Sequence, residues 1–246
     1  MPIKTTLNYS PNFSLTKRDE NQIKFIIFHY TGMKSEREAI DRLTNIQSEV
    51  SSHYLIKNNG EILTLVPDLY VAWHAGASKW KNFNSLNKNS IGIEINNPGH
   101  QFNYKSFSNK QIYSLIKLSR YLIKKYKIKD ENILGHSDIA PYRKKDPGEK
   151  FPWEYLAKYE IGIWHNLDKK YLKKFRNKRI DLVEKEITLK NIYKIGYSKN
   201  LSKNIKKFKK EEFLVKAFQR RFRKELINGK IDKECLLISK KLIKLN

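Results

Sequence analysis

Two histidines and one aspartate have the types and positions for metal chemistry. In GHSDIAPYRKKDPGEKFPW (135–153), His136 ends a short apolar run and Asp146 follows ten residues later, in a stretch too rich in proline to predict a helix. His29 ends a separate apolar run, IKFIIFH (23–29). Two imidazoles and one carboxylate, with a fourth position left for water, are the donor set of a catalytic zinc site.

Spacing alone leaves a second interpretation open. A histidine at a strand end is usually a satisfied core or surface side chain, and an aspartate before a proline is usually a turn former. The restricted backbone around Pro141 and Pro147 favours the metal interpretation, because ligands must be held near a fixed geometry. A closed structural site more often uses cysteines, and this chain has only Cys235, which we expect to be a buried or half-buried, unreactive thiol in a helix.

Strands must deliver these residues. The apolar run 23–29 and SIGIEIN (90–96) predict buried strands, and residues 133–136 predict a short strand that leads into His136. SSHYLIKNNGEILTLV (51–66) predicts two strands joined at an Asn-Asn-Gly turn.

Two amphipathic helices lie between the strands. Ser35 and Glu38 predict the start of one helix, whose apolar face extends as far as Val50. Ser108 and Gln111 predict the start of a longer one. Strands that alternate with helices predict an α/β domain over residues 20–165, built on a mixed central sheet flanked by helices.

The composition changes after residue 165. A Lys-rich, weakly apolar stretch precedes a compact segment (211–245) with helical patterns on either side of Asn228-Gly229. We therefore divide the chain into residues 1–170 and a small α-helical domain, residues 171–246.

The net charge of +25, from 50 Lys and Arg against 25 Asp and Glu, raises nucleic-acid binding as an alternative function. The lysines are scattered over helix faces rather than gathered with stacking aromatics, so we predict no nucleic-acid partner. No apolar run is long enough to span a bilayer. Residues 1–20 contain no signal-peptide core and no cysteine for a lipid, so as given the chain is expected to be cytoplasmic; a trimmed start would make it periplasmic or secreted.

Five motifs together resemble one family, the zinc-dependent N-acetylmuramoyl-L-alanine amidases called amidase-2, which are related to peptidoglycan recognition proteins. The motifs are FHYTG (28–32), SSHYLI (51–56), AWHAG (72–76), SIGIEINNPG (90–99) and GHSDIAPYRKKDPGEKFPW (135–153). Their order and spacing match the family over about residues 20–165. The chain resembles the AmiD type, because IGIW follows and the tail AFQRRF…LINGKIDKE is similar to a peptidoglycan-binding three-helix module. Enzymes of the related AmpD type lack that tail.

The resemblance implies roles for five residues. His29, His136 and Asp146 match the family's ligands of one zinc ion per chain. Glu94 matches the acidic residue that activates the attacking water. Lys144 matches the residue proposed to stabilise the oxyanion.

Three further side chains have expected positions. Trp73 and His74, in AWHAG, are expected to line the substrate groove. His53 lies in a predicted strand, and we expect it to pack in the core or to support a ligand.

The resemblance implies hydrolysis of the amide between N-acetylmuramic acid, or its 1,6-anhydro form, and the L-alanine of peptidoglycan stem peptides. Peptidoglycan fragments would be the partners, in cell-wall degradation or recycling. A peptidoglycan recognition protein that binds without cutting is the alternative. It predicts the loss of Asp146 or Glu94, and both are present.

Overall fold

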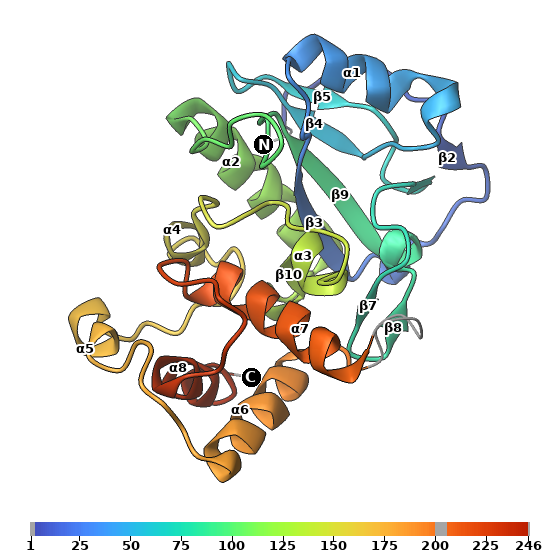
Figure 1. Ribbon diagram of the computed structural model, residues 1–246. Coiled ribbons are helices and arrows are strands. Elements are labelled where there is room, and N and C mark those ends of the chain that lie inside the picture. Colours follow the sequence, from blue (N-terminus) through green and yellow to red (C-terminus); the bar gives the residue numbers. More distant parts are fainter. Residues whose placement is uncertain (1–2, 200–205, 246) are drawn as a thin grey trace.

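A six-stranded sheet forms the centre of the computed structural model, which describes residues 3–199 and 206–245; part of the Lys-rich stretch, 200–205, lies outside them. The strand order is β1-β5-β4-β9-β3-β10 (Figure 1). Neighbours are parallel except in the β4–β5 hairpin, which confirms the predicted mixed sheet. The strands are β1 (Thr6–Leu7), β3 (Phe25–Tyr30), β4 (Tyr54–Ile56), β5 (Ile62–Thr64), β9 (Ser90–Ile95) and β10 (Ile133–Gly135).

Smaller elements complete the fold. Two short antiparallel ribbons pair β2 (Phe13–Ser14) with β6 (Val71–Ala72), and β7 (Lys79–Trp80) with β8 (Phe83–Asn84). The α-helices are α1 (Glu36–Thr44), α2 (Asn109–Tyr126), α3 (His136–Ile139), α4 (Trp153–Ala157), α5 (Lys169–Lys173), α6 (Leu182–Ile195), α7 (Lys207–Phe222) and α8 (Lys233–Leu242). Single 3₁₀ turns occupy Glu20–Gln22, Ile46–Ser48, Leu86–Asn89 and Asp130–Asn132.

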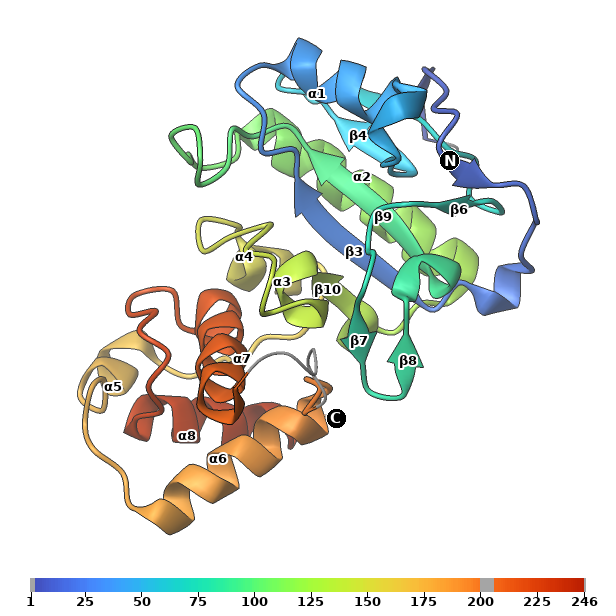
Figure 2. The ribbon, with the colours of Figure 1, turned by 45° about the vertical axis from the view of Figure 1, so that its right-hand side comes forward.

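The central strand β3 is apolar on both faces because both are covered. Ile26 and Phe28 pack in one core with the buried face of α2. Phe25 and Ile27 point the other way, into a second core. That second core continues without a break into the C-terminal helices, which gather below α3 and β10 (Figure 2). Its members from those helices include Ile192, Ile195, Leu214, Phe218, Phe222, Cys235, Ile238 and Leu242.

The strand register brings the candidate residues to one edge. His29 on β3 lies directly opposite Glu94 on the parallel strand β9. Gly135 on β10 pairs with Phe28, so His136, the next residue, follows beside His29. The carboxyl ends of β3, β9 and β10 therefore meet, which is where open α/β sheets bind ligands.

Helix starts were better predicted than helix ends. Ser108 and Gln111 form the predicted capping box of α2, and Ser35 accepts from the Glu38 N–H at the start of α1. The predicted extension of the first helix to Val50 is wrong, because α1 ends at Thr44 and Ile46 is 68% exposed. Asn45 is extended and its side chain caps the following 3₁₀ turn.

The stretch 135–153 contains one helical turn that the sequence did not predict. Helix α3 begins at His136 and ends at Ile139, before Pro141. The Asp138 carboxylate accepts from the Gly135 N–H at 2.8 Å and closes the turn from its N-terminal side. The paired helices on either side of Asn228-Gly229 were predicted correctly, as α7 and α8.

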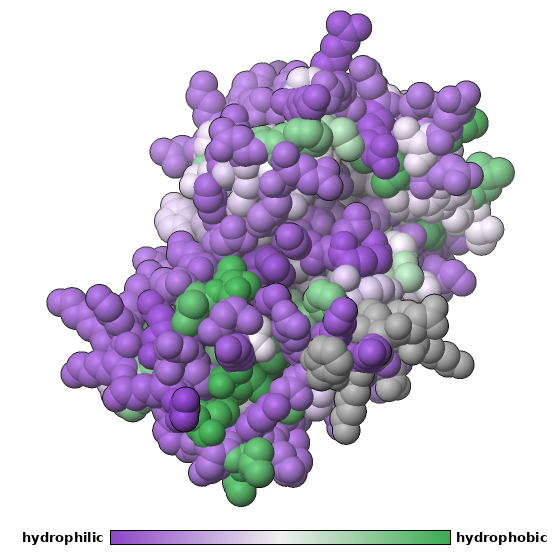
Figure 3. All heavy atoms as spheres, viewed as in Figure 1, coloured by the Kyte–Doolittle hydropathy of each residue, from purple (hydrophilic) through white to green (hydrophobic). Residues whose placement is uncertain are grey.

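The surface in Figure 3 is mostly hydrophilic, with its clearest apolar area over the C-terminal helices. Leu182 and Val183, at the start of α6, are among the exposed apolar residues. Among the described residues, no helix is both long and apolar enough to cross a membrane.

Candidate metal centre and active site

Three buried side chains meet at the edge of the sheet. The Nδ1 atoms of His29 and His136 lie 2.9 Å apart. The Asp146 Oδ2 lies 3.0 Å from the first and 3.1 Å from the second. The loop that carries Asp146 is fixed to α3, because the Ser137 N–H donates to the Asp146 carbonyl at 2.8 Å. Within the part of the chain that the structure describes, this is the one group of three such residues placed to hold a metal.

A chain of hydrogen bonds assigns the proton on His29. The Ser90 hydroxyl donates to the Leu86 carbonyl at 2.6 Å, so its oxygen accepts from His74 Nε2–H at 3.2 Å. His74 Nδ1 is then unprotonated and accepts from His29 Nε2–H at 3.0 Å. His29 must therefore present an unprotonated Nδ1 to Asp146 and His136.

Burial keeps these imidazoles neutral. It lowers the pKa of His29 to about 4 and that of His74 well below its usual value. His136, whose pKa burial also lowers, has its Nε2 3.1 Å from the Ala75 carbonyl and 3.2 Å from a terminal nitrogen of Arg143; donation of Nε2–H to the carbonyl leaves Nδ1 unprotonated, the tautomer that a metal ligand needs. Arg143 donates to the same carbonyl and so fixes it in place.

The three inward atoms are acceptors without a proton between them. With no positive charge between them, the two nitrogen lone pairs and the Asp146 carboxylate repel one another, and a cation bound by all three would remove that repulsion. Tetrahedral coordination with bonds of 2.0–2.1 Å requires donors roughly 3.3 Å apart. The observed separations of 2.9 to 3.1 Å differ from that by a few tenths of an ångström. The donor set thus fits one divalent cation.

Glu94 supplies a carboxylate beside this group. Its Oε2 is enclosed and has no hydrogen-bond partner among the described residues. Burial, with the nearby charge of Asp146, raises the pKa of Glu94 to about 8, and the Lys144 ammonium opposes that rise. An enclosed carboxylate without a partner destabilises the fold, so its presence points to a chemical role.

A hollow of about 470 Å³ opens over these residues. It is lined by the three candidate ligands together with Glu94, His74 and Lys144. Its rim carries the cations Arg42, Arg143 and Lys145. A hollow of this size can hold a sugar with part of a peptide, and its rim favours carboxylates.

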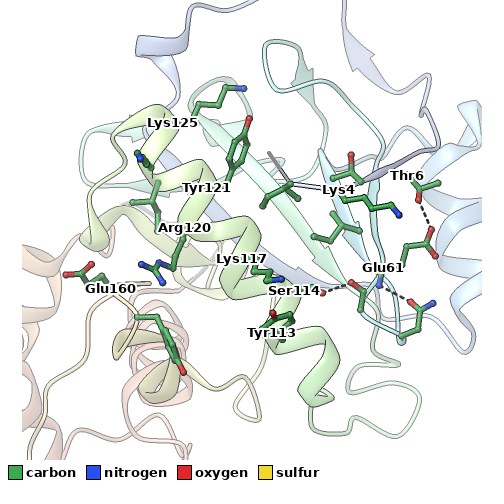
Figure 4. A pocket seen from close by; sticks show the side chains of 18 residues that line it. Lys4, Thr6, Glu61, Tyr113, Ser114, Lys117, Arg120, Tyr121, Lys125 and Glu160 are labelled. Atoms are coloured by element: carbon green, nitrogen blue, oxygen red, sulfur yellow. Dashed lines mark hydrogen bonds between the residues drawn. The ribbon is translucent and has the colours of Figure 1, made fainter. Parts of the chain in front are cut away.

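A second hollow, of about 1540 Å³, lies over the outer face of α2 and the β4–β5 hairpin (Figure 4). Lys117, Arg120 and Tyr113 project from α2, and Glu61 accepts from the Thr6 hydroxyl. These basic and aromatic side chains form no converging set of donors, so we place the chemistry at the smaller hollow.

Trp73 and His53 are held by other contacts. The Trp73 indole N–H donates to Ser14 Oγ at 3.2 Å, so its part in the groove remains a prediction. His53 Nδ1 accepts from the Gly92 N–H at 3.0 Å and its Nε2–H donates to the Tyr70 carbonyl at 3.1 Å. Burial lowers the pKa of His53 to about 3, so it is a neutral packing histidine.

Sequence reasoning missed the residues that orient the ligands. Ser90 holds His74, which orients His29, and the Ala75 carbonyl holds His136. Gly92 leaves room for the His74 ring, because a Cβ at position 92 would lie 2.4 Å from that ring. One signal was available: positions 90, 92 and 94 alternate on one face of an otherwise apolar strand as Ser, Gly and Glu.

The comparisons with known proteins agree with this geometry. The profile of a family described as N-acetylmuramoyl-L-alanine amidase matches residues 19–149. N-acetylmuramoyl-L-alanine amidase AmiD of Escherichia coli (strain K12) is 36% identical over 234 residues, which are 90% of this chain and 83% of the relative. 1,6-anhydro-N-acetylmuramyl-L-alanine amidase AmpD of Haemophilus influenzae is 42% identical over 113 residues, or 45% of this chain and 59% of that protein.

Solved structures show the same likeness. A complex of E. coli AmiD with the substrate anhydro-N-acetylmuramic acid-L-Ala-D-gamma-Glu-L-Lys has a TM-score of 0.78 and 35% identity, covering 91% of this chain and 90% of that one. AmpDh3 from Pseudomonas aeruginosa, in complex with anhydromuramic pentapeptide, has a TM-score of 0.77 and 29% identity, covering 94% of each chain.

Replacing His74 by Phe is expected to weaken metal binding about 10- to 100-fold, because the acceptor that keeps the proton on His29 Nε2 is lost. His74→Asn, whose amide oxygen can still accept from that N–H, should lose much less metal affinity than His74→Phe. The dissociation constant for zinc, from competition with a chelator, is the measurement. Equal affinity in His74→Phe and the unmodified chain would show that the hydrogen-bond chain does not set the protonation of His29.

Proposed function

This chain belongs to the N-acetylmuramoyl-L-alanine amidase family, and on that premise we propose that it cleaves the amide between N-acetylmuramic acid and L-alanine with one zinc ion held by His29, His136 and Asp146. It is a hydrolase that acts on peptidoglycan. The observation that carries the metal proposal is the meeting of three unprotonated donor atoms within 3.1 Å. Two nitrogens and one carboxylate oxygen, with further positions open, suit zinc.

Muramoyl peptides with the 1,6-anhydro end are proposed substrates as well. The similar AmiD and AmpDh3 structures hold anhydromuramic peptides. In this chain, Arg42 and Lys145 on the rim of the hollow offer positive charge for the carboxylates of a stem peptide.

Glu94 and Lys144 are the proposed catalytic residues. A bound zinc ion would act as a Lewis acid towards the amide carbonyl and a water molecule. Glu94 takes the proton of the attacking water and passes it to the departing amine of L-alanine. The Lys144 ammonium stabilises the negative charge that develops on the carbonyl oxygen. A cation held by the three ligands would lower the pKa of Glu94 and so favour its ionised form, in which it can accept a proton.

The C-terminal helices, residues 171–246, are proposed as a peptidoglycan-binding-like domain. The 36% identity to AmiD extends over 90% of this chain and so includes most of this region. A binding-only function is not favoured, because all five proposed ligand and catalytic residues are present.

Defined muropeptides, with and without the anhydro end, should be cut between the muramic acid and L-alanine. Mass spectrometry would then find the free stem peptide and the sugar, their masses together exceeding the substrate by one water. Removal of the metal should abolish the cleavage and zinc should restore it. The same stem peptide without muramic acid should stay intact, and its digestion would identify a peptidase instead.

Glu94→Ala and His136→Ala should separate proton transfer from metal binding. We expect Glu94→Ala to retain the metal and to lose about 100- to 10,000-fold in turnover, because Glu94 is the carboxylate that lines the hollow beside the proposed ligand Asp146. His136→Ala should lose the metal itself. Metal content and turnover are measured on the same samples, and unmodified turnover in Glu94→Ala would refute its role as the base.

Lys144→Met should slow turnover about 100- to 1000-fold and also change its pH dependence. The Lys144 ammonium lowers the pKa of Glu94, so its removal raises that pKa, and the acidic limb of kcat/KM moves to higher pH. Lys145→Met, at the exposed neighbouring position, is the matched control and should leave the limb in place. An unchanged acidic limb of kcat/KM in Lys144→Met would show that the Lys144 charge does not affect the pKa of Glu94.

A further inference from the structure

Helix α7 contacts the segment that carries His136 through a buried ion pair. Arg221 is 4% exposed and donates to the carboxylate of Asp138, which is 1% exposed, at 2.7 Å. Its other terminal nitrogen donates to the Ile133 carbonyl on β10 at 3.0 Å. Tyr197, which follows α6, donates its hydroxyl to the second Asp138 oxygen at 2.6 Å. Asp138 stands two residues after His136, so two bonds from the C-terminal region hold the turn that presents this ligand, and a third holds the strand before it.

The preceding residue of α7 lies near the loop that carries Asp146, and a chain of side chains continues from there to the residue after His29. Arg220 lies 3.9 Å from the carboxylate of Glu149, three residues after Asp146. Glu149 also pairs with His100 Nε2 at 3.0 Å. His100 Nδ1 lies 2.9 Å from the hydroxyl of Tyr30, the residue after His29.

Aromatic side chains pack against the Arg221 guanidinium. The Arg221 guanidinium lies 4.2 Å from the centre of the Trp153 ring and 5.0 Å from that of Phe222. Helix α7 lies against α3 in both ribbon views (Figures 1 and 2). Because a buried charge is costly without its partner, Asp138 and Arg221 must remain together.

We propose that Arg221, supported by Arg220, is a positioning residue of the metal site, and that α7 is thereby part of the active site. The inference rests on the proposed metal ligands. Arg221 fixes Asp138, which caps the first turn of α3 at the Gly135 N–H and so sets the direction of His136. Neither arginine lines the hollow over the proposed ligands. A domain added only to bind peptidoglycan would have no need of such contacts with the ligand segments.

Arg221→Met in the full chain tests the proposal, because Met keeps the apolar stem and removes the hydrogen bonds. We expect the zinc dissociation constant, from chelator competition, to rise about 10-fold or more. In the metal-free protein, amide hydrogen exchange at residues 135–147 should accelerate, since the Gly135 and Ser137 N–H bonds depend on this turn. Arg221→Lys, which retains the charge, should recover part of both effects.

Arg176→Met is the matched control. Arg176 makes two 2.8 Å bonds to the buried Glu234 within the C-terminal helices, so its loss should also lower the unfolding temperature. Arg176→Met should change zinc affinity less than about twofold, since the Arg176 side chain does not contact Asp138. If Arg221→Met fails to fold, Tyr197→Phe removes one bond to Asp138 without a change of charge, and a smaller change in the same direction is expected.

Wild-type zinc affinity and wild-type exchange at 135–147 in a folded Arg221→Met would overturn the proposal. So would equal losses of zinc affinity in Arg221→Met and Arg176→Met, because both would then report general destabilisation. The exchange measurement needs neither metal nor substrate. Failure of the chain to cut muropeptides would therefore contradict the proposed function and not this inference.

Discussion

The site depends on holding three buried acceptor atoms, Nδ1 of His29, Nδ1 of His136 and Oδ2 of Asp146, within 3.1 Å of one another. Two unprotonated imidazole nitrogens and a carboxylate oxygen repel one another, and the fold must supply the energy to keep them together. Parallel strands provide the frame, because β3, β9 and β10 end at the same edge of the sheet. Close packing on both faces of β3 makes that edge rigid enough to resist the repulsion.

Neutral hydrogen-bonded groups around the ligands decide which nitrogen carries the proton. His74 and Ser90 orient His29 from its Nε2 side without adding charge there. Among the described charged residues that line the hollow, Asp146, Glu94 and Lys144 are given a role in metal binding or catalysis, and Arg42, Arg143 and Lys145 surround them. The same burial that suppresses protonation of the histidines raises the pKa of Glu94, so one physical cause prepares both the ligands and the base.

The sequence predicted the features that are local and periodic. Strand 23–29, the Asn-Asn-Gly hairpin and the capping box at Ser108 depend on neighbouring residues, and the structure has them. The ligands were recognisable only as five motifs taken together, since each histidine alone had an ordinary explanation. What the sequence could not show was the set of contacts between distant segments. His74 lies 45 residues from His29, and Arg221 lies 83 from Asp138, so neither spacing nor periodicity connects them.

The C-terminal helices share a hydrophobic core with the sheet, so they contact the segments of the site more directly than a domain joined by a flexible linker would. A module joined by a flexible linker could bind glycan while leaving the metal geometry unchanged. Here the second core continues from Phe25 on β3 to Phe218 on α7, and a buried arginine crosses between the two parts. AmpD-type relatives match only the catalytic part of this chain, so the fold itself does not require these helices. The requirement arises from Asp138: once a carboxylate is buried beside His136, a buried cation must accompany it, and α7 is the element that provides one.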